Sequence, residues 1–371
     1  MDKEFDYSIA LNQIYEKLLR NHNRFTKKYP HISGLRNEEM TLNYKPMEND
    51  LWTSSFFPGE MLLAYGITHD RAFLSDAEAY LESFGYRLNN KIGISHDLGF
   101  LYSLTCVSLH RLTGDALAKE LSQKAAKELF LRYNSKGKFI QAWGEIGVGN
   151  PYVKIIADTM LNLPLLYQIG ISQYSDAASE HAYTSAKYIV RDDFSSFHTY
   201  LMDPVTGKAV EGRTHQGFRD SSTWARGQAW IVYGYALSYG YTREKKFIEI
   251  SQKAADYFIE RLPANKVSYW DLTFSDRIPD IRDTSATAIL ATGLLELSEY
   301  LEKEQARKYT DVAKEILKKM YEQYFYPNVD SPVLLTDGMY HRDNGSTGTI
   351  WGDYFFMEAL AKMSGHYVKF W

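Results

Sequence analysis

The sequence predicts an all-α fold, an (α/α)6 toroid of six inner and six outer helices. Three observations predict it. Helical periodicity recurs along the whole chain of 371 residues, apolar helical segments alternate with segments that carry one charged face, and short connections alternate with long ones. No Pro-, Gly- or Ser-rich linker interrupts the chain, so a single domain over residues 1–371 is expected rather than the two or so that length alone suggests.

The helices are identified from the spacing of apolar residues. Tyr7, Leu11, Ile14 and Leu18, for example, fall on one face of a helix. The twelve segments with such spacing are, approximately, residues 6–25, 56–66, 70–87, 97–113, 115–133, 155–169, 174–191, 224–241, 243–262, 283–301, 304–325 and 351–364.

The even-numbered segments are more apolar than the odd-numbered ones. Residues 98–112 (LGFLYSLTCVSLHRL) are apolar or small nearly all round, which is typical of a helix buried on all sides. Residues 116–133 (ALAKELSQKAAKELFLRY) carry one charged face and one apolar stripe, which is typical of an outer helix. Each apolar helix leads into its charged successor through a short turn, with a glycine expected at the helix C-cap: Gly66, Gly114, Gly170 and Gly240.

The links from charged to apolar helices are long. They cover residues 26–55, 88–96, 134–154, 192–223, 263–282 and 326–350. In a toroid these links and the beginnings of all inner helices lie at one end, where we expect the functional site. An open α-solenoid is the alternative, but its repeats should be more alike in length.

Composition excludes several classes of protein. The 42 Lys and Arg against 46 Asp and Glu give a net charge of −4, so the chain lacks the basic surface that binding to nucleic acid or an anionic membrane requires. The single cysteine, Cys106, excludes an intramolecular disulfide, and the sequence contains no signal-peptide pattern and no apolar run of membrane-spanning length. We therefore expect a cytoplasmic protein. With no HExxH motif and no acidic calcium loop, neither a metal nor another cofactor is expected.

Residues suited to binding and catalysis cluster around the beginnings of the inner helices. They are Trp52 before the second segment, His96 and Asp97 at the fourth, Trp143 and Asp158 at the sixth, His198, His215, Gln216, Trp224, Arg226 and Trp230 at the eighth, Arg282 and Asp283 at the tenth, and Trp351 at the twelfth. Five of the seven tryptophans thus fall in one zone with two candidate carboxylates. Aromatic faces combined with paired acids suit a sugar, whose C–H groups stack on rings while its hydroxyls need directed hydrogen bonds.

Asp97 and Asp158 begin two different inner helices, so a toroid can bring them together although 61 positions separate them. Two carboxyl groups in one pocket can hold different protonation states, one serving as a general acid while the other stays ionised. The alternative for Asp97 is a simple helix N-cap. Asp158 follows Ile155, Ile156 and Ala157 and precedes an apolar stretch, a position that favours a functional or paired acid.

The other candidates also have structural alternatives. His198 and His215, taken singly, can be hydrogen-bonded loop histidines. Asp283 suits an N-cap, and Arg226 can hold the segment between Trp224 and Trp230 in place.

The sequence also resembles a known family. The motifs SHDLGFLYSL, IQAWG, IIADTMLNLPLL, GRTHQGFRDSSTWARGQAWIVYGYAL, IRDTSATAI and TIWGDYFFMEAL resemble, in order and over nearly the whole chain, the unsaturated glucuronyl hydrolases of glycoside hydrolase family 88. The resemblance implies an (α/α)6 barrel, a catalytic aspartate pair at Asp97 and Asp158, and substrate contacts from Trp52, His96, Trp143, His198, His215, Gln216, Trp224, Arg226 and Trp230. The segment TDGMYHRDNGSTGTIWG (residues 336–352) departs from the family pattern.

The resemblance implies an unusual reaction on the oligosaccharides that polysaccharide lyases produce. The uronic acid at the non-reducing end of these oligosaccharides carries a C4=C5 double bond. An acid, Asp158, protonates C4, positive charge develops at C5 and the ring oxygen, and water adds at C5. The carboxylate of Asp158 then serves as base for the water while Asp97 supplies charge and orientation nearby. The product hemiketal opens and expels the remaining sugar, and glycosaminoglycan-type disaccharides are the substrates implied.

Three other functions remain open at this point. The first is hydrolysis of unsaturated rhamnogalacturonan disaccharides, which uses the same barrel, although THQG followed by STWARGQAW favours the glucuronyl activity. The second is a sugar epimerase, in which His198 and His215 would abstract and return a proton. The third is a non-catalytic sugar-binding toroid, for which two buried acids would be an unexplained cost.

Overall fold

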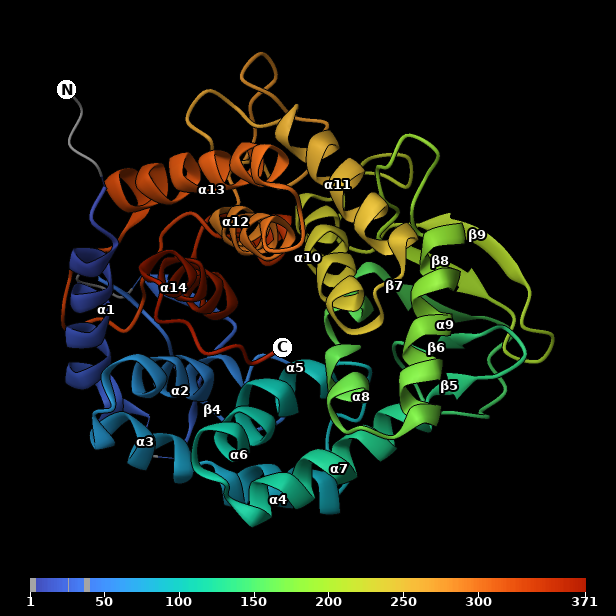
Figure 1. Ribbon diagram of the computed structural model, residues 1–371, viewed down its shortest axis with the longest axis horizontal. Coiled ribbons are helices and arrows are strands. Elements are labelled where there is room, and N and C mark those ends of the chain that lie inside the picture. The colour runs from blue at the N-terminus through green and yellow to red at the C-terminus, as the bar shows by residue number, and fades with distance from the viewer. Residues whose placement is uncertain (1–4, 26, 37–40) are drawn as a thin grey trace.

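Two concentric rings of helices form the molecule (Figure 1). The structure, a computed structural model, describes residues 5–25, 27–36 and 41–371. The inner ring consists of α2 (Phe56–Thr68), α5 (Leu98–Tyr102) continued by a π-helical turn (Ser103–Val107) and α6 (Ser108–Thr113), α8 (Pro164–Gln168), α10 (Ala225–Thr242), α12 (Thr284–Ser298) and α14 (Ile350–Ser364). The outer ring consists of α1 (Tyr7–Asn21), α3 (Arg71–Glu78) with α4 (Leu81–Asn89), α7 (Ala116–Phe130), α9 (Ser172–Tyr188), α11 (Lys245–Ile259) and α13 (Lys303–Tyr324).

The predicted (α/α)6 toroid is confirmed. The last inner helix, α14, packs against α1 and α2, so the ring closes and the open solenoid is excluded. Every residue of α12 from Thr284 to Leu297 is buried, whereas α13 buries only Tyr309, Ala313, Ile316, Leu317 and Met320 at helical spacing. The contrast in polarity read from the sequence therefore separates the two rings.

Three of the predicted helices differ from the structure. The segment predicted over 70–87 is divided into α3 and α4, and the one over 97–113 contains the π-helical turn. The prediction that a helix begins at residue 155 was wrong, because Ile155 and Ile156 belong to β7 (Val153–Ile156), where they pair with Tyr200 and Thr199 of β8 (Thr199–Met202). A 3-10 helix (Ala157–Leu161) then connects β7 to α8.

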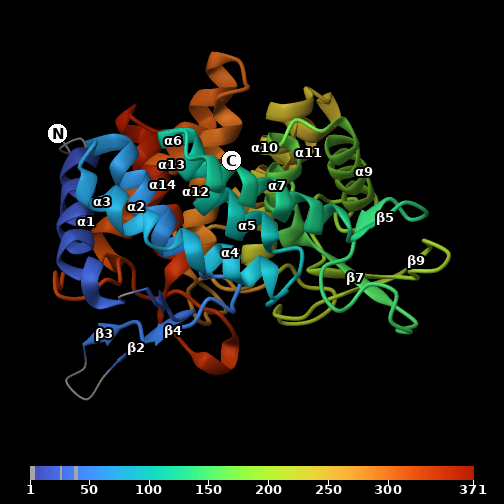
Figure 2. The same ribbon diagram turned by 90° about the horizontal axis from the view of Figure 1, so that it is seen from below.

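Short strands, which the sequence did not predict, occupy most of the long links. An antiparallel sheet combines β7, β8 and β9 (Ala209–Arg213). Smaller pairings join β1 (Tyr29–Pro30) to β4 (Pro46–Met47), β2 (Ser33–Arg36) to β3 (Leu42–Asn43) and β10 (Gly348–Thr349), and β5 (Tyr133–Asn134) to β6 (Phe139–Ile140). Figure 2 shows β2, β3, β4, β7 and β9 gathered at one end of the helical ring.

Two of the four predicted glycine caps are correct. Gly114 and Gly170 have φ of 78° and 76°, the left-handed conformation typical of a C-cap. The other two predictions were wrong, because the left-handed caps after α2 and α10 are His69 and Arg243. Gly240 instead lies within α10, where an added Cβ would come within 2.4 Å of the Tyr300 hydroxyl.

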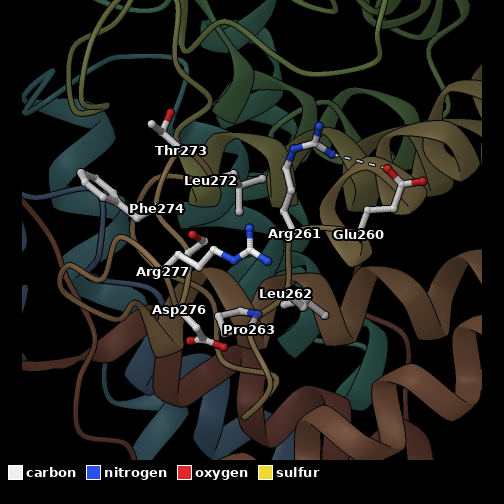
Figure 3. A pocket seen from close by; sticks show the side chains of 10 residues that line it. Glu260, Arg261, Leu262, Pro263, Leu272, Thr273, Phe274, Asp276 and Arg277 are labelled. Carbon is white, nitrogen blue, oxygen red and sulfur yellow. Dashed lines mark ion pairs between the residues drawn. The ribbon is translucent and has the colours of Figure 1, made fainter.

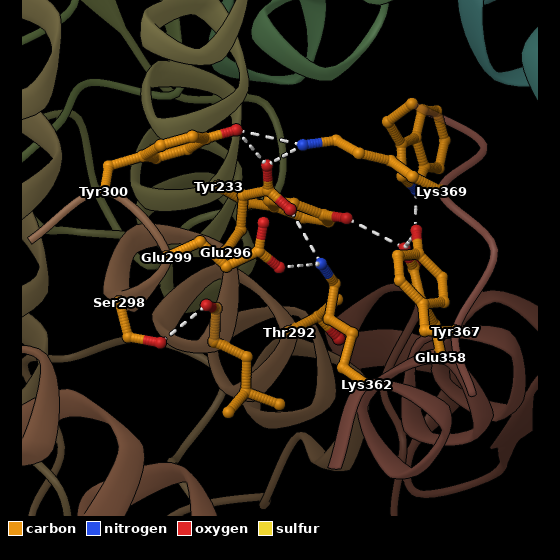
Figure 4. A network of polar contacts seen from close by, with 12 residues as sticks. Tyr233, Thr292, Glu296, Ser298, Glu299, Tyr300, Glu358, Lys362, Tyr367 and Lys369 are labelled. Carbon is orange, nitrogen blue, oxygen red and sulfur yellow. Dashed lines mark hydrogen bonds and ion pairs between the residues drawn. The ribbon is translucent and has the colours of Figure 1, made fainter. Parts of the chain in front are cut away.

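A polar network joins α12, α14 and the C-terminal segment (Figure 4). Glu296 of α12 is fully buried and pairs with Lys362 of α14 at 2.6 Å and with Lys369 of the C-terminal segment. Burial alone would raise the pKa of Glu296, but these two ammonium groups hold it below its ordinary value. Glu358 of α14 accepts hydrogen bonds from the buried side chains of Tyr233 and Trp371 and from the half-buried Tyr367. The C-terminal segment is thereby held in the centre of the ring.

The described residues include no helix that is both long and apolar enough to cross a bilayer.

The close packing of Gly99 of α5 against the backbone of Asn162 predicts a sensitive position. A Cβ on Gly99 would lie 2.2 Å from Asn162 Cα, whereas a Cβ on Gly85 of α4 meets only the Leu121 side chain at 3.6 Å. Because backbone cannot yield easily, Gly99→Ala should lower the free energy of unfolding by at least about 2 kcal/mol. Gly85→Ala should be neutral or slightly stabilising, because alanine favours a helix. Denaturant unfolding of both variants checks this, and equal stability of the two would contradict it.

Candidate active site

A cavity of about 190 Å³ opens at the end of the ring that carries the long links. Ten residues line it: Trp52, His96, Asp97, Trp143, Ile156, Asp158, His215, Gln216, Arg226 and Tyr340. Eight of these were predicted from the sequence. The reason is topological, since the residues ahead of or at the start of each inner helix meet at one end of a toroid.

Three predicted substrate contacts lie behind the cavity wall rather than in it. His198, Trp224 and Trp230 are at most 3% exposed. The ring of Trp224 lies 4.2 Å from the His198 ring and 4.4 Å from the Arg226 guanidinium, while Trp230 packs against Phe100 with ring centroids 5.3 Å apart. These side chains support the residues that face the cavity.

Asp97 stands at the N-cap position of α5, yet its side chain does not cap that helix. Its carboxylate instead accepts a hydrogen bond of 2.8 Å from the Ser95 hydroxyl and faces the cavity. His96 Nε2 lies 3.3 Å from Asp97 Oδ1. The alternative reading of Asp97 as a simple helix cap therefore has no support in the geometry.

Asp158 lies in the first turn of the 3-10 helix that follows β7. Among the residues described, no hydrogen-bond donor reaches its buried Oδ2 atom. Burial raises the pKa of Asp158 to about 7; the nearby Arg226 guanidinium lowers it and the negative charge of Asp97 raises it. The carboxyl group therefore retains its proton close to neutral pH, as a general acid requires.

Two buried histidines, His96 and His198, lie beside the two carboxyl groups, and both imidazole rings are neutral. Burial lowers the pKa of both His96 and His198. His198 Nδ1 accepts hydrogen bonds of 3.1 Å from the backbone N–H groups of His215 and Gln216, so the proton of this neutral ring is on Nε2, which lies 3.7 Å from Asp158 Oδ2. His198 thus fixes the loop that carries two cavity residues and directs an N–H toward Asp158.

Arg226 and Asp283 form an ion pair buried beneath the cavity, with Nη1 and Oδ2 3.2 Å apart. Asp283 also caps α12, as predicted, by accepting from the backbone N–H groups of Ser285 and Ala286. Arg226 donates to the carbonyl oxygens of Met339 and Tyr340. Its guanidinium therefore holds the link before α14 rather than only the segment between Trp224 and Trp230.

The sequence analysis missed two residues of the cavity wall. Ile156 was assigned to a helix, and its place on a strand brings it beside Asp158. Tyr340 belongs to the segment that departs from the family pattern and is held by Gln216 Nε2, which donates to its carbonyl oxygen at 2.9 Å. The link before α14 has no periodic pattern that could have identified Tyr340, and the aromatic side chain was the one indication of a role in sugar binding.

The two other inner-helix candidates have structural roles. Arg282 pairs with Asp276 at 3.0 Å, away from the cavity. Trp351 is fully buried and packs against Trp52 and Tyr340, with ring centroids 5.2 and 5.8 Å away. Trp351 therefore supports two aromatic walls of the cavity from below.

A larger surface hollow of about 330 Å³ lies beside the end of α11 (Figure 3). Glu260, Arg261, Asp276 and Arg277 are among its lining residues, and none of the predicted site residues is. Asp276 is already engaged by Arg282 and by the Tyr269 hydroxyl. This hollow therefore lacks the carboxyl pair and the tryptophans that distinguish the cavity. Nor does any group of three or more His, Cys, Asp or Glu side chains suited to a metal ion occur in the described part of the chain.

Comparison with known proteins agrees with this geometry. The sequence pattern of Glycosyl Hydrolase Family 88 matches residues 20–366. The chain belongs to this family. Among curated family 88 relatives, an unsaturated chondroitin disaccharide hydrolase of Streptococcus agalactiae serotype III (strain NEM316) is 39% identical over 373 residues, which cover 98% of this chain and 92% of that protein. Family membership makes the chain a glycoside hydrolase and excludes the non-catalytic sugar-binding toroid.

Solved structures of relatives share the whole fold. A crystal structure of unsaturated glucuronyl hydrolase from S. agalactiae superimposes with a TM-score of 0.93 at 38% identity, covering 100% of this chain and 94% of that one. A mutant of that enzyme complexed with dGlcA-GalNAc6S has a TM-score of 0.86 at 35% identity, with coverage of 100% and 94%.

Proposed function

We propose that the chain is an unsaturated glucuronyl hydrolase that releases the 4,5-unsaturated uronic acid from the non-reducing end of lyase-generated oligosaccharides. One observation carries this function: Asp158, whose pKa is raised to about 7, shares with Asp97 a cavity walled by Trp52 and Trp143. A protonated carboxyl, a second carboxylate and aromatic faces are what acid-catalysed addition of water to a sugar double bond needs.

The reaction begins with proton transfer from Asp158 to C4 of the unsaturated ring. Positive charge then develops at C5 and the ring oxygen, where the nearby Asp97 carboxylate stabilises it. Asp158, now ionised, removes a proton from the water that adds at C5. The hemiketal so formed opens and expels the remaining sugar. The separation rule for retaining and inverting glycosidases does not apply, since C1 is not attacked.

The other cavity residues bind and orient the substrate. Trp52 and Trp143 offer faces for the sugar ring, and His215, Gln216 and Arg226 bring N–H donors to the same space. His96 and His198 act from beside the carboxyl groups, because both are almost fully buried. Their neutral rings lie beside the carboxyl groups without adding positive charge.

The relatives indicate the second sugar. One is named for unsaturated chondroitin disaccharides, and a mutant of a relative was complexed with dGlcA-GalNAc6S. We therefore propose an unsaturated chondroitin-type disaccharide as substrate, and the cytoplasmic site of action expected from the sequence stays a proposal. The epimerase alternative is disfavoured, because His198 Nδ1 already accepts two backbone hydrogen bonds and cannot also accept a proton from a sugar.

Isotope labelling tests the chemistry itself. The unsaturated disaccharide and its saturated counterpart are each incubated with the enzyme in ¹⁸O-labelled water. Hydration places the label at C5 of the keto-uronate, removes the absorbance of the double bond and leaves the saturated compound intact, because that compound has no double bond to protonate. Cleavage of the saturated compound would reject the proposal.

Substitution of the two aspartates separates their roles. Asp158→Asn keeps the size of the side chain but removes the transferable proton, so turnover should fall by two to four orders of magnitude, about what general acid catalysis contributes. Asp97→Asn should reduce kcat less completely, since the role of Asp97 is electrostatic. Initial rates from loss of absorbance measure both effects. A tenth of wild-type activity in Asp158→Asn would assign the acid elsewhere, and near-normal activity in Asp97→Asn would remove its proposed role.

The pH dependence follows from the raised pKa of Asp158. The acid must be protonated, so kcat/KM should fall as pH rises through about 7, tenfold per pH unit once the group is ionised. In Asp97→Asn the negative charge that raises this pKa is absent, so the alkaline limb of the residual activity should move to lower pH. An alkaline limb at the same pH in both proteins would contradict the electrostatic link.

A further inference from the structure

Lys154 belongs to β7, the strand that leads to Asp158, and lies two positions before the cavity residue Ile156. In β7 it pairs with Leu201 of β8, and Ile156 pairs with Thr199 in the same regular register. Side chains two positions apart on a strand project from the same face. Because Ile156 lines the cavity, Lys154 projects toward the cavity rim as well.

The ammonium group of Lys154 lies near two residues of the cavity wall. Its Nζ atom is 5.7 Å from the centroid of the Trp143 ring, and the His215 ring is 5.4 Å from the same tryptophan. After burial, the positive charge of Lys154 is the largest influence that lowers the pKa of His215. The field of this lysine therefore extends into the side of the cavity formed by Trp143 and His215.

Lys154 also lacks a protein counter-ion. Within the described ranges no carboxylate lies within 4.0 Å of its Nζ atom, although the side chain is half-buried. Arg226 and Arg342, by contrast, pair with Asp283 and Asp280 at 3.2 and 3.3 Å. An uncompensated cation at the rim of a substrate cavity is suited to an anionic group of the ligand.

We infer that Lys154 is a further substrate-binding residue, which pairs with an anionic oxygen group of the disaccharide. This assignment rests on the proposed function. Two groups of the substrate have the required chemistry, the carboxylate of the unsaturated uronate and a sulfate ester on the second sugar. Both present oxygen atoms that accept charge-assisted hydrogen bonds from an ammonium group.

The test compares Lys154→Gln with a matched control, Lys208→Gln. Lys208 is exposed in the turn between β8 and β9 of the same sheet, so the control makes the same change of charge outside the cavity. Kinetics are measured on unsaturated chondroitin disaccharides with and without a 6-sulfate. We expect KM to rise at least about tenfold in Lys154→Gln, as expected for loss of a hydrogen bond to a charged group, with kcat within threefold. Lys208→Gln should behave as the wild type.

The pattern across substrates distinguishes the two anions. A rise in KM for both disaccharides supports pairing with the carboxylate, and a rise only for the sulfated one supports pairing with the sulfate. Unchanged KM for both, or a fall in kcat at constant KM, would overturn the assignment, since the latter is the result expected if Lys154 only supports Trp143. Lys154→Met retains the aliphatic stem beside Trp143 and should reproduce the rise in KM, even if Lys154→Gln folds poorly.

Direct binding separates this inference from the proposed function. Dissociation constants for both disaccharides are measured by calorimetry on Asp158→Asn, with and without Lys154→Gln, so that no turnover intervenes. Weaker binding by about tenfold or more in the double variant supports the role of Lys154, and equal binding overturns it. A wild-type enzyme that consumed neither disaccharide would instead reject the proposed function.

Discussion

The buried ion pair between Arg226 and Asp283 is the constraint on which the site depends. It joins the beginnings of two neighbouring inner helices, α10 and α12, at the end of the ring where the cavity opens. Both side chains are almost fully buried, so each charge needs the other, and loss of either partner would leave an isolated charge in the interior. The same guanidinium donates to the carbonyl oxygen of Tyr340, which thereby takes its place in the cavity wall. A single arginine thus lines the cavity, connects two helices and fixes a loop from a third part of the chain.

The side chains around Asp97 and Asp158 give these two carboxyl groups different surroundings. Asp97 is oriented by the Ser95 hydroxyl, while the Oδ2 atom of Asp158 accepts no hydrogen bond from the residues described. Burial raises the pKa of Asp158 to about 7, because water cannot solvate the charged form of a buried carboxyl. His198 adds a fixed N–H near Asp158 without a charge. The protonation of Asp158 near neutral pH therefore comes from its surroundings and not from its sequence neighbours alone.

The sequence was sufficient for the order of the rings and for most of the cavity, because helical periodicity is local and a toroid places the beginnings of all inner helices together. It could not resolve β7, since an apolar run such as Ile155 and Ile156 suits a strand or a buried helix, and pairing with β8 decides between them. Nor could it say how deep a side chain lies. Arg226 and Trp230 are one helical turn apart on the same face of α10, yet only Arg226 reaches the cavity. The Glu296 network was missed because a charged residue in an apolar helix gives no sign of partners over 60 positions away.

The filled centre of the ring limits which part of a polysaccharide chain can reach the site. Trp371 is buried against Phe100, Tyr233 and Phe355 of three inner helices, and the ion pair of Glu296 with Lys369 holds the C-terminal segment in the centre of the ring. The site is therefore a blind pocket with one entrance. A polysaccharide cannot thread through it, so attack is exolytic and each chain presents only its terminal residue. The sugar released carries no C4=C5 double bond, so each chain is cleaved once, and both products leave by the route through which the substrate entered.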